Sequence, residues 1–224
     1  MFWNNSEQEE HNYWISYTDL VMGLLMAFIV VSMVLFSRDS EKAALDGKYS
    51  ELVTAFKEKF KDNEGIEVTD DATIRFVLNR TKAKELFTSG DYHPTDYTNK
   101  LLEEFIPAYF DEILDIYQPR QDSFEIKELR IEGHTDSEGT YYNNLHFSSG
   151  RAVKIQSLIL QDQYFQTYPK KFQEFVQQNS IACGYSFSRL LDADGNLVSK
   201  SRKEEDCDRS RRVEFRVILE YIKR

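Results

Sequence analysis

Two residues of opposite charge, Asp136 and Arg151, stand fifteen positions apart in the C-terminal half of the chain. Asp136 follows a segment that favours a strand, and Arg151 lies in a segment whose apolar residues have helical spacing. A carboxylate accepts hydrogen bonds from an ammonium group, and a guanidinium group can hold a carboxylate with two parallel bonds. Fixed a few ångströms apart, the two side chains could bind a zwitterionic amino acid, or they could form a salt bridge that serves only the fold.

Two further polar residues accompany this pair. Asn144 stands near the expected start of the helix, where its amide could bond a peptide backbone or cap the helix. His134 is interpreted as a packing or hydrogen-bonding residue, because neither an acid–base partner nor a nucleophile is apparent for it. The sequence therefore predicts no hydrolase here, and no enzyme.

A third residue of unusual chemistry, Asp19, stands near the start of an apolar stretch from about Tyr13 to Phe36. As a helix, this stretch is long enough to cross about 30 Å of hydrocarbon. An ionisable group costs about 2.5–3.5 kcal/mol at the centre of a spanning helix, and less near one end. The Asp19 carboxylate could snorkel or cap the N-terminus of the helix, or it could be a titrating group in a proton or sodium path.

The apolar stretch is predicted to be a retained anchor. A cleaved signal peptide needs a basic start and a small-residue cleavage site. The first twelve residues contain three glutamates and no lysine or arginine, and no A-x-A pattern follows the stretch. The nearest cations, Arg38, Lys42 and Lys48, all follow the stretch, and by the positive-inside rule alone they would place the C-terminal domain in the cytoplasm.

Residues 37–65 are predicted to form an amphipathic helical connector, separated from the membrane helix by Ser37-Arg38-Asp39. Its apolar residues repeat at helical spacing over about 20 residues, or about 30 Å. They are Leu45, Tyr49, Leu52, Val53, Phe56 and Phe60. This stripe could pack on the chain's own C-terminal domain, or it could bind a partner or a second copy next to the membrane.

The composition limits the class of partner. The chain has 224 residues, 41% of them hydrophobic, and a net charge of −10. This acidic balance argues against nucleic acid as a partner and against electrostatic binding to anionic lipid. The length allows one ordinary domain beside the anchor.

Residues 66–224 are predicted to fold as an α+β domain with helices on one face of a mixed sheet. Period-two alternation or β-rich composition predicts strands at 73–79, 125–132, 181–185 and 212–222. Helical periodicity predicts helices at 96–117 and 147–160, with a shorter one at 169–179.

Two motifs resemble known families. Trp14-Ile-Ser-Tyr-Thr-Asp19-Leu20, followed by Phe28, resembles the W-x-S-x-x-D-L signature of MotB-type stator subunits, in which the aspartate carries the ion. Gly133-His-Thr135-Asp136, followed by Asn144, Ser148 and Arg151-Ala152, resembles the GHTD motif and helix of OmpA-like peptidoglycan-binding domains.

The second resemblance extends along the domain. Leu86-Phe87 with Gly90, Gly184-Tyr185 and Arg211-Arg212-Val213-Glu214 match the family's turns and last strand, although Ser210 stands where asparagine is usual. It implies that Thr135, Asp136, Asn144, Arg151 and Arg211 bind peptidoglycan, whose diaminopimelate residue offers an ammonium and a carboxylate.

Together the motifs imply the B subunit of an ion-driven rotary stator, with two copies threaded through a pentamer of a polytopic MotA- or ZorA-like partner. Residues 1–12 would be cytoplasmic, 13–36 would span the inner membrane, and the C-terminal domain would be periplasmic, against the flanking charges. Ion passage at Asp19 would need no cofactor. The short acidic N-terminus and short connector look most like ZorB subunits of Zorya anti-phage systems. A flagellar MotB-like subunit or a passive wall anchor are the alternatives.

A segment at 190–208 exceeds a minimal domain of this kind. Asp194-Gly195 predicts a hairpin turn, and Asp192, Asp194 and Asn196 could bind calcium, although the EF-hand pattern is incomplete. Outside the cytosol, Cys183 and Cys207 could pair and tie this segment to the sheet; otherwise they are unrelated thiols. No cysteine and histidine pattern predicts a structural metal site.

Overall fold

The computed structural model describes residues 5–78, 85–88, 90–118 and 124–222, with only the backbone described at 5–13 and 15–16. The chain divides into two compact units, Met1–Asp46 and Gly47–Arg224. The division falls inside the segment predicted as a connector. The two units are therefore described separately.

A single helix, α1 (Asn5–Phe60), contains the whole described part of the first unit and enters the second. It includes one apolar stretch that is long enough to cross a membrane. Large apolar side chains from Leu20 to Phe36 are exposed, as expected for side chains that meet lipid or another membrane helix.

One expectation about this helix is wrong, and one of the alternatives for Asp19 is excluded. Ser37-Arg38-Asp39 ends the apolar stretch but not the helix, because these residues leave the backbone hydrogen bonds of a helix intact, and the Ser37 hydroxyl bonds Glu41 on the next turn. Asp19 does not cap a helix N-terminus, because α1 begins at Asn5 and Asp19 lies about four turns inside it.

The second unit is built on a five-stranded mixed sheet with the strand order β1-β2-β5-β3-β4. The strands are β1 (Ile66–Val68), β2 (Ile74–Phe76), β3 (Phe124–Gly133), β4 (Ser180–Gly184) and β5 (Val213–Tyr221). Only the β3–β4 pair is parallel. The predicted strand at 73–79 is shorter than expected, and β1 was not predicted.

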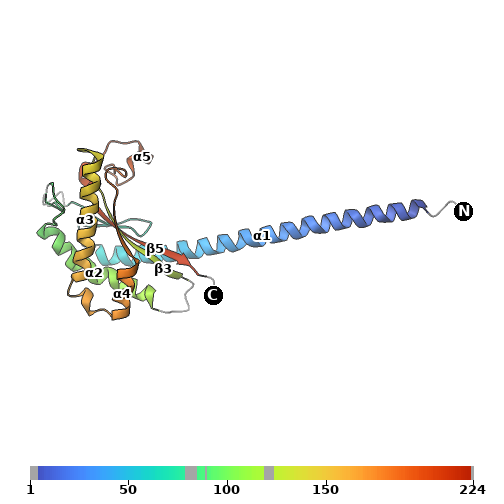
Figure 1. The fold of residues 1–224 in the computed structure, drawn as a ribbon, viewed down its shortest axis with the longest axis horizontal. Helices are drawn as coiled ribbons and strands as arrows, with labels where there is room; N and C mark the ends of the chain where they lie inside the picture. The colour runs from blue at the N-terminus through green and yellow to red at the C-terminus, as the bar shows by residue number, and fades with distance from the viewer. Residues whose placement is uncertain (1–4, 79–84, 89, 119–123, 223–224) are drawn as a thin grey trace. The chain divides into compact units, whose positions relative to one another are not determined.

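Three helices, α2 (Asp96–Tyr117), α3 (Tyr141–Gln161) and α4 (Lys170–Asn179), pack on one side of this sheet (Figure 1). A 3-10 turn, η2 (Phe165–Thr167), joins α3 to α4. Two short helices, α5 (Val198–Ser201) and α6 (Cys207–Ser210), lie in the segment before β5. The α+β fold predicted from the sequence is confirmed.

Alternation along the strands places most apolar side chains on one face of the sheet and most charged ones on the other, apart from a register shift between Ile126 and Glu128 of β3. Along β5, Val213, Phe215, Val217 and Leu219 are buried with the helices, whereas Glu214 and Arg216 take the opposite face. The same alternation places Glu132 of β3 and Arg75 of β2 on that charged face, where both form ion pairs with residues of β5. Period two in the sequence thus produces one apolar face and one ionic face.

The C-terminal turns of α1 pack inside the second unit. Phe56 is fully buried and stacks on Tyr109 of α2, with 5.6 Å between ring centroids. Phe60 stacks on Phe105 of the same helix at 5.9 Å. The Tyr49 hydroxyl donates to the Val217 carbonyl and accepts from the Leu219 amide. Of the two interpretations of the connector stripe, packing on the chain's own domain therefore holds for these residues.

Candidate functional site

A cleft of about 310 Å³ opens where the β3–α3 loop meets the segment after β2. Four parts of the chain contribute its walls, and the residues predicted to bind a ligand are among them. The lining residues are Leu78, Glu85, Leu86, Phe87, Gly90, Thr135, Asp136, Glu138, Asn144, Phe147, Arg151 and Arg211. The five residues that the OmpA-like resemblance selects are thus brought together in one cleft.

Close backbone packing sets the position of α3 against the sheet. A Cβ atom on Gly133 would lie 2.0 Å from the Ser148 carbonyl oxygen, and one on Gly184 would lie 2.4 Å from the Ser149 nitrogen. The Ser148 hydroxyl also accepts a hydrogen bond from the Ser186 amide at 3.0 Å. Because Arg151 follows Ser148 by about one turn, these contacts fix its distance from the loop.

Asp136 is largely buried, and both of its carboxylate oxygens have partners. Oδ1 accepts from the Glu138 amide at 3.2 Å, and Oδ2 accepts from Nη1 of Arg211 at 3.2 Å. Arg211 donates its other terminal nitrogen to Asp208 at 2.7 Å. Burial opposes the charge on Arg211, but the bond to Asp208 and the charge of Asp136 outweigh it and raise the pKa of Arg211.

Arg151 reaches the opposite wall of the cleft. Its Nε donates to the Asp91 carbonyl oxygen at 3.2 Å, and its guanidinium carbon lies 5.0 Å from the centre of the Phe87 ring. Burial lowers the pKa of Arg151, and the charge of Asp136 acts in the opposite direction. Within the described residues no ion pair includes Arg151, so its terminal nitrogens could hold a ligand carboxylate.

Asn144 and Thr135 complete the loop. The helix cap is Thr140, whose side chain accepts from the Asn143 amide, so the capping interpretation of Asn144 is wrong. The Asn144 amide instead donates to the Glu138 carbonyl at 2.7 Å and closes the loop onto α3. Thr135 is buried, and its hydroxyl has no partner among the described residues.

Buried charges lie beneath the loop, on the ionic face of the sheet. The His134 ring stacks on Tyr185 at 5.3 Å, and its Nε2 lies 3.5 Å from Glu132 and 3.8 Å from Glu214. Burial lowers the pKa of His134 to about 4, although both glutamates act in the opposite direction. His134 is therefore neutral at pH 7.

Among the described residues, Glu132, His134 and Glu214 form a group that could hold a metal ion, since their ligand atoms lie within 4.8 Å of one another. Guanidinium groups already occupy the carboxylates, however. Arg189 bonds Glu132 at 2.7 Å, and Arg212 bonds Glu214 at 2.7 Å. A metal ion would have to displace this positive charge, which makes the cluster a structural ion network rather than a metal centre.

No family model matches this chain. A protein from Escherichia coli strain ATCC 8739, described as Zorya protein ZorB, is 27% identical over 95% of this chain and 90% of its own length. The predicted resemblance to ZorB is confirmed. A second Zorya protein ZorB, from Escherichia coli O139:H28, is 24% identical over 95% of this chain and 82% of its own length.

The resemblance to ZorB thus spans both the apolar helix and the sheet domain. Among solved structures, a putative MotB-like protein from Desulfovibrio vulgaris aligns with a TM-score of 0.46 and 20% identity. The alignment covers 84% of this chain and 98% of that one.

The predicted disulfide is wrong. Both cysteines are free, Cys183 half-buried on β4 and Cys207 exposed at the start of α6. Burial raises the pKa of both thiols, and the nearby charge that adds most to this differs: Glu132 for Cys183 and Glu205 for Cys207. The segment they were expected to tie down is held by hydrogen bonds instead.

The predicted turn at Asp194-Gly195 is present. Gly195 has a positive φ of 81°, and Asp192 accepts from the amides of Asp194 and Asn196. Asp194 pairs with Lys203 at 2.6 Å, so an ammonium group already neutralises this carboxylate. Calcium binding here stays a prediction.

Several residues in the cleft or next to it were not singled out from the sequence. Phe87 and Asp91 bring the segment after β2 against Arg151, and Glu205 and Asp208 bring the segment before β5 against the Asp136 loop. The Leu86-Phe87 turn motif was a signal for Phe87 and Asp91. No local pattern in the sequence marked Glu205 and Asp208.

Proposed function

We propose that this chain is the single-span subunit of an ion-driven membrane stator, anchored to peptidoglycan and acting in Zorya-type defence. The resemblance to ZorB over nearly the whole chain supports the assignment to a Zorya-type system. An apolar helix with an internal carboxylate and a cleft lined by an acid and an arginine support the two halves of the function.

The wall-binding half rests on one observation: Asp136 and Arg151 line the same cleft. The diaminopimelate residue of a peptidoglycan stem carries an ammonium and a carboxylate on one carbon. The ammonium would bond Asp136, whose carboxylate has further acceptor capacity beyond its two present partners. The carboxylate would bond the free end of the Arg151 guanidinium. Thr135 and Asn144 would border the ligand, with Arg211 behind Asp136.

The membrane half rests on Asp19. Two copies of the helix would pass through a pentamer of a polytopic partner, with the N-terminus in the cytoplasm and the sheet domain in the periplasm. Protons or sodium ions would pass through Asp19, and each change of its charge would alter its contacts with the partner. One charge that crosses 100 mV releases about 2.3 kcal/mol, which is enough to bias such contacts.

The wall-binding half is tested with the full chain in detergent, sedimented with purified sacculi that contain diaminopimelate. We expect the wild-type chain to sediment with the sacculi and to be released by a soluble disaccharide tripeptide that carries the same residue. Sacculi whose stems carry lysine in place of diaminopimelate are the matched control, because they lack the second carboxylate. Equal retention on both kinds of sacculi contradicts the proposed ligand.

The ion-carrying half is tested with Asp19→Asn in cells that carry this chain and its partner genes. We expect the wild type to reduce phage plaquing and Asp19→Asn to abolish the reduction at equal membrane abundance. Asp39→Asn, an exposed carboxylate beyond the apolar stretch, is the control and should keep full activity. Full protection by Asp19→Asn would leave the chain as a passive wall anchor.

A further inference from the structure

We propose that the segment 190–208, called here the insert, is a strut that positions the ligand-binding carboxylate, with Glu205 and Asp208 as its positioning residues. The inference rests on the proposed wall-binding function and goes beyond it, because it gives the segment between β4 and β5 a task in recognition.

The first contact joins the insert to the residue after Asp136. Glu205 accepts two hydrogen bonds from Ser137, one from the backbone amide to Oε1 at 3.2 Å and one from the hydroxyl to Oε2 at 2.5 Å. A carboxylate that accepts from both groups of one residue fixes the orientation of that residue. Because Ser137 follows Asp136 directly, the direction of the Asp136 side chain is constrained as well.

The second contact reaches Asp136 itself through Arg211. Asp208, on α6, bonds Nη2 of Arg211 at 2.7 Å, and Nη1 of the same guanidinium bonds Asp136 at 3.2 Å. The nitrogens of the planar guanidinium have fixed relative positions, so the bond to Asp208 also fixes the position of the nitrogen that bonds Asp136. The insert therefore holds the carboxylate on one side through its backbone neighbour and on the other through Arg211.

The insert can act as a strut because its own base is fixed. The Leu191 carbonyl accepts from the Asp206 amide at 2.7 Å, and the Leu191 amide donates to the Ser210 hydroxyl at 3.0 Å. Leu191 and Ser210 are both buried. Arg209 of α6 bonds Glu67 of β1 at 2.7 Å, which ties this end of the insert to the edge of the sheet.

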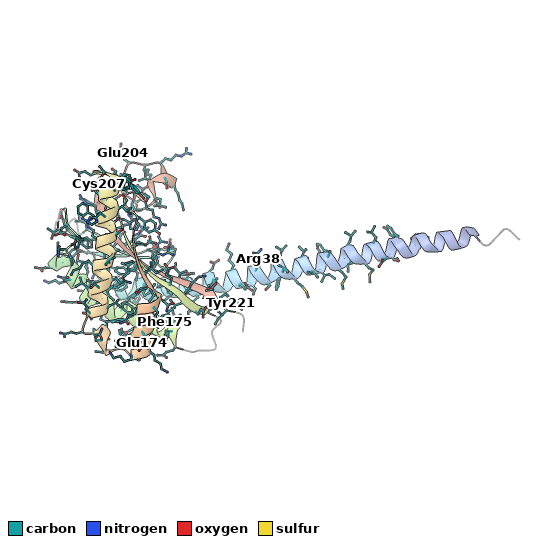
Figure 2. All side chains as sticks on the ribbon, viewed as in Figure 1. Arg38, Glu174, Phe175, Glu204, Cys207 and Tyr221 are labelled. Carbon is teal, nitrogen blue, oxygen red and sulfur yellow. The ribbon has the colours of Figure 1, made fainter. Side chains whose placement is uncertain are left out.

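The location agrees with this task. Glu204 and Cys207 lie at the end of the domain that also carries α5, far from the end that carries Glu174 and Phe175 of α4 (Figure 2). Glu204, one position before Glu205, is exposed, and in the described part of the chain it shares neither of the hydrogen bonds that Glu205 accepts from Ser137. This pair offers two acids of equal charge, of which one touches the loop and one does not.

A held loop should bind more tightly for an entropic reason. The loop between Asp136 and Thr140 contains Gly139 at a φ of +90°, a conformation that an unconstrained chain samples along with many others. If the insert removes these alternatives before the ligand arrives, binding no longer has to pay for ordering the loop.

The test is titration calorimetry on the full chain in detergent, which measures its affinity for a disaccharide tripeptide that carries diaminopimelate. We expect Glu205→Ala to weaken binding by about three- to tenfold, the range for losing a hydrogen bond of ordinary net strength, because Glu205 positions the loop and does not touch the ligand. Asp208→Asn should weaken it similarly. Glu204→Ala should bind as the wild type does. Hydrogen exchange of residues 135–139 should become faster in Glu205→Ala and stay unchanged in Glu204→Ala, at equal melting temperature.

A merely structural role for Glu205 would lower the melting temperature without a selective change in loop exchange or affinity. Ser137→Ala in combination with Glu205→Ala should cost no more than Glu205→Ala alone. Glu205→Ala already removes both bonds to Ser137, whereas Ser137→Ala removes only the bond from the hydroxyl. If Glu205→Ala does not fold, Glu205→Gln keeps the shape and removes the charge. Wild-type affinity in the Glu205 variants overturns the strut. Failure of the wild type to bind the tripeptide overturns the proposed ligand instead, and with it the task given to the strut.

Discussion

Asp136 is bonded to Arg211, with 3.2 Å between Oδ2 and Nη1, while Arg151 on the other wall of the cleft bonds a backbone carbonyl. The acid of the predicted ligand pair thus has a resident cation, and the predicted basic partner does not have a resident acid among the described residues. Asp136 and Arg151 therefore do not form the structural salt bridge that was the alternative to ligand binding. Among the described residues, the terminal nitrogens of the Arg151 guanidinium have no carboxylate partner, so they could receive an incoming carboxylate.

Replacing either member of the ligand pair should weaken binding of the diaminopimelate tripeptide. A hydrogen bond to a charged group contributes about 1.5–3 kcal/mol, so Asp136→Asn and Arg151→Gln should each weaken affinity by about ten- to a hundredfold. Calorimetry on the full chain in detergent measures this. Glu103→Gln on α2 and Lys154→Gln on α3 are matched controls that remove one charge outside the cleft lining. An Arg151→Gln variant with wild-type affinity would remove Arg151 from the site.

The buried His134 should make stability depend on pH. Its pKa is lowered from 6.5 to about 4 by burial, so between these values the unfolded chain binds a proton that the folded chain does not. Stability must then fall as the pH is lowered through this window, by about 3 kcal/mol in all at about 1.4 kcal/mol per pKa unit.

Urea unfolding at a series of pH values from 7 to 4 measures this effect. Acidic residues add their own dependence, since Glu214 also has a lowered pKa, opposed by burial and caused mainly by the charge of Arg212. The comparison is therefore made between variants. His134→Gln should reduce the dependence of the free energy of unfolding on pH between 7 and 4, whereas His146→Gln on the exposed face of α3 should not. Equal slopes in all three proteins would contradict a buried neutral His134.

Gly133 should be irreplaceable, because a Cβ atom there would lie 2.0 Å from the backbone oxygen of Ser148. Gly133→Ala must push α3 away from β3, at a cost of about 1–3 kcal/mol or more, and should also weaken ligand binding by moving Arg151. Gly47→Ala is the control: nothing lies within 4 Å of the added carbon, and alanine should stabilise the helix by about 0.5–1 kcal/mol. The urea concentration at the midpoint of unfolding measures both effects. If Gly133→Ala and Gly47→Ala shift this midpoint in the same direction, the close packing at Gly133 is contradicted.

Much of the fold could be predicted from the sequence because its signals are local. The bounds of α2 follow from an apolar stripe with helical period behind the Thr95 cap, and β3 and β5 follow from period-two alternation. The start of α3 was placed too late, at 147 instead of Tyr141, because its first turns carry polar residues whose cap at Thr140 was not recognised. The three residues of β1 are too few to show a period.

The sequence by itself selected the candidates for ligand binding. The loop, helix and last-strand motifs name Thr135, Asp136, Asn144, Arg151 and Arg211, and each carries the chemistry in its own side chain. Only the tertiary structure decided their partners. Asp136 pairs with Arg211, 75 positions away, and Ser137 is held by Glu205, 68 positions away. The free thiols of Cys183 and Cys207 have the same origin. No local pattern states which side chains meet when β4 pairs with β3 and α6 bonds the edge strand β1. Such pairings depend on how the strands are ordered in the sheet, and that order arises from the packing of the whole domain.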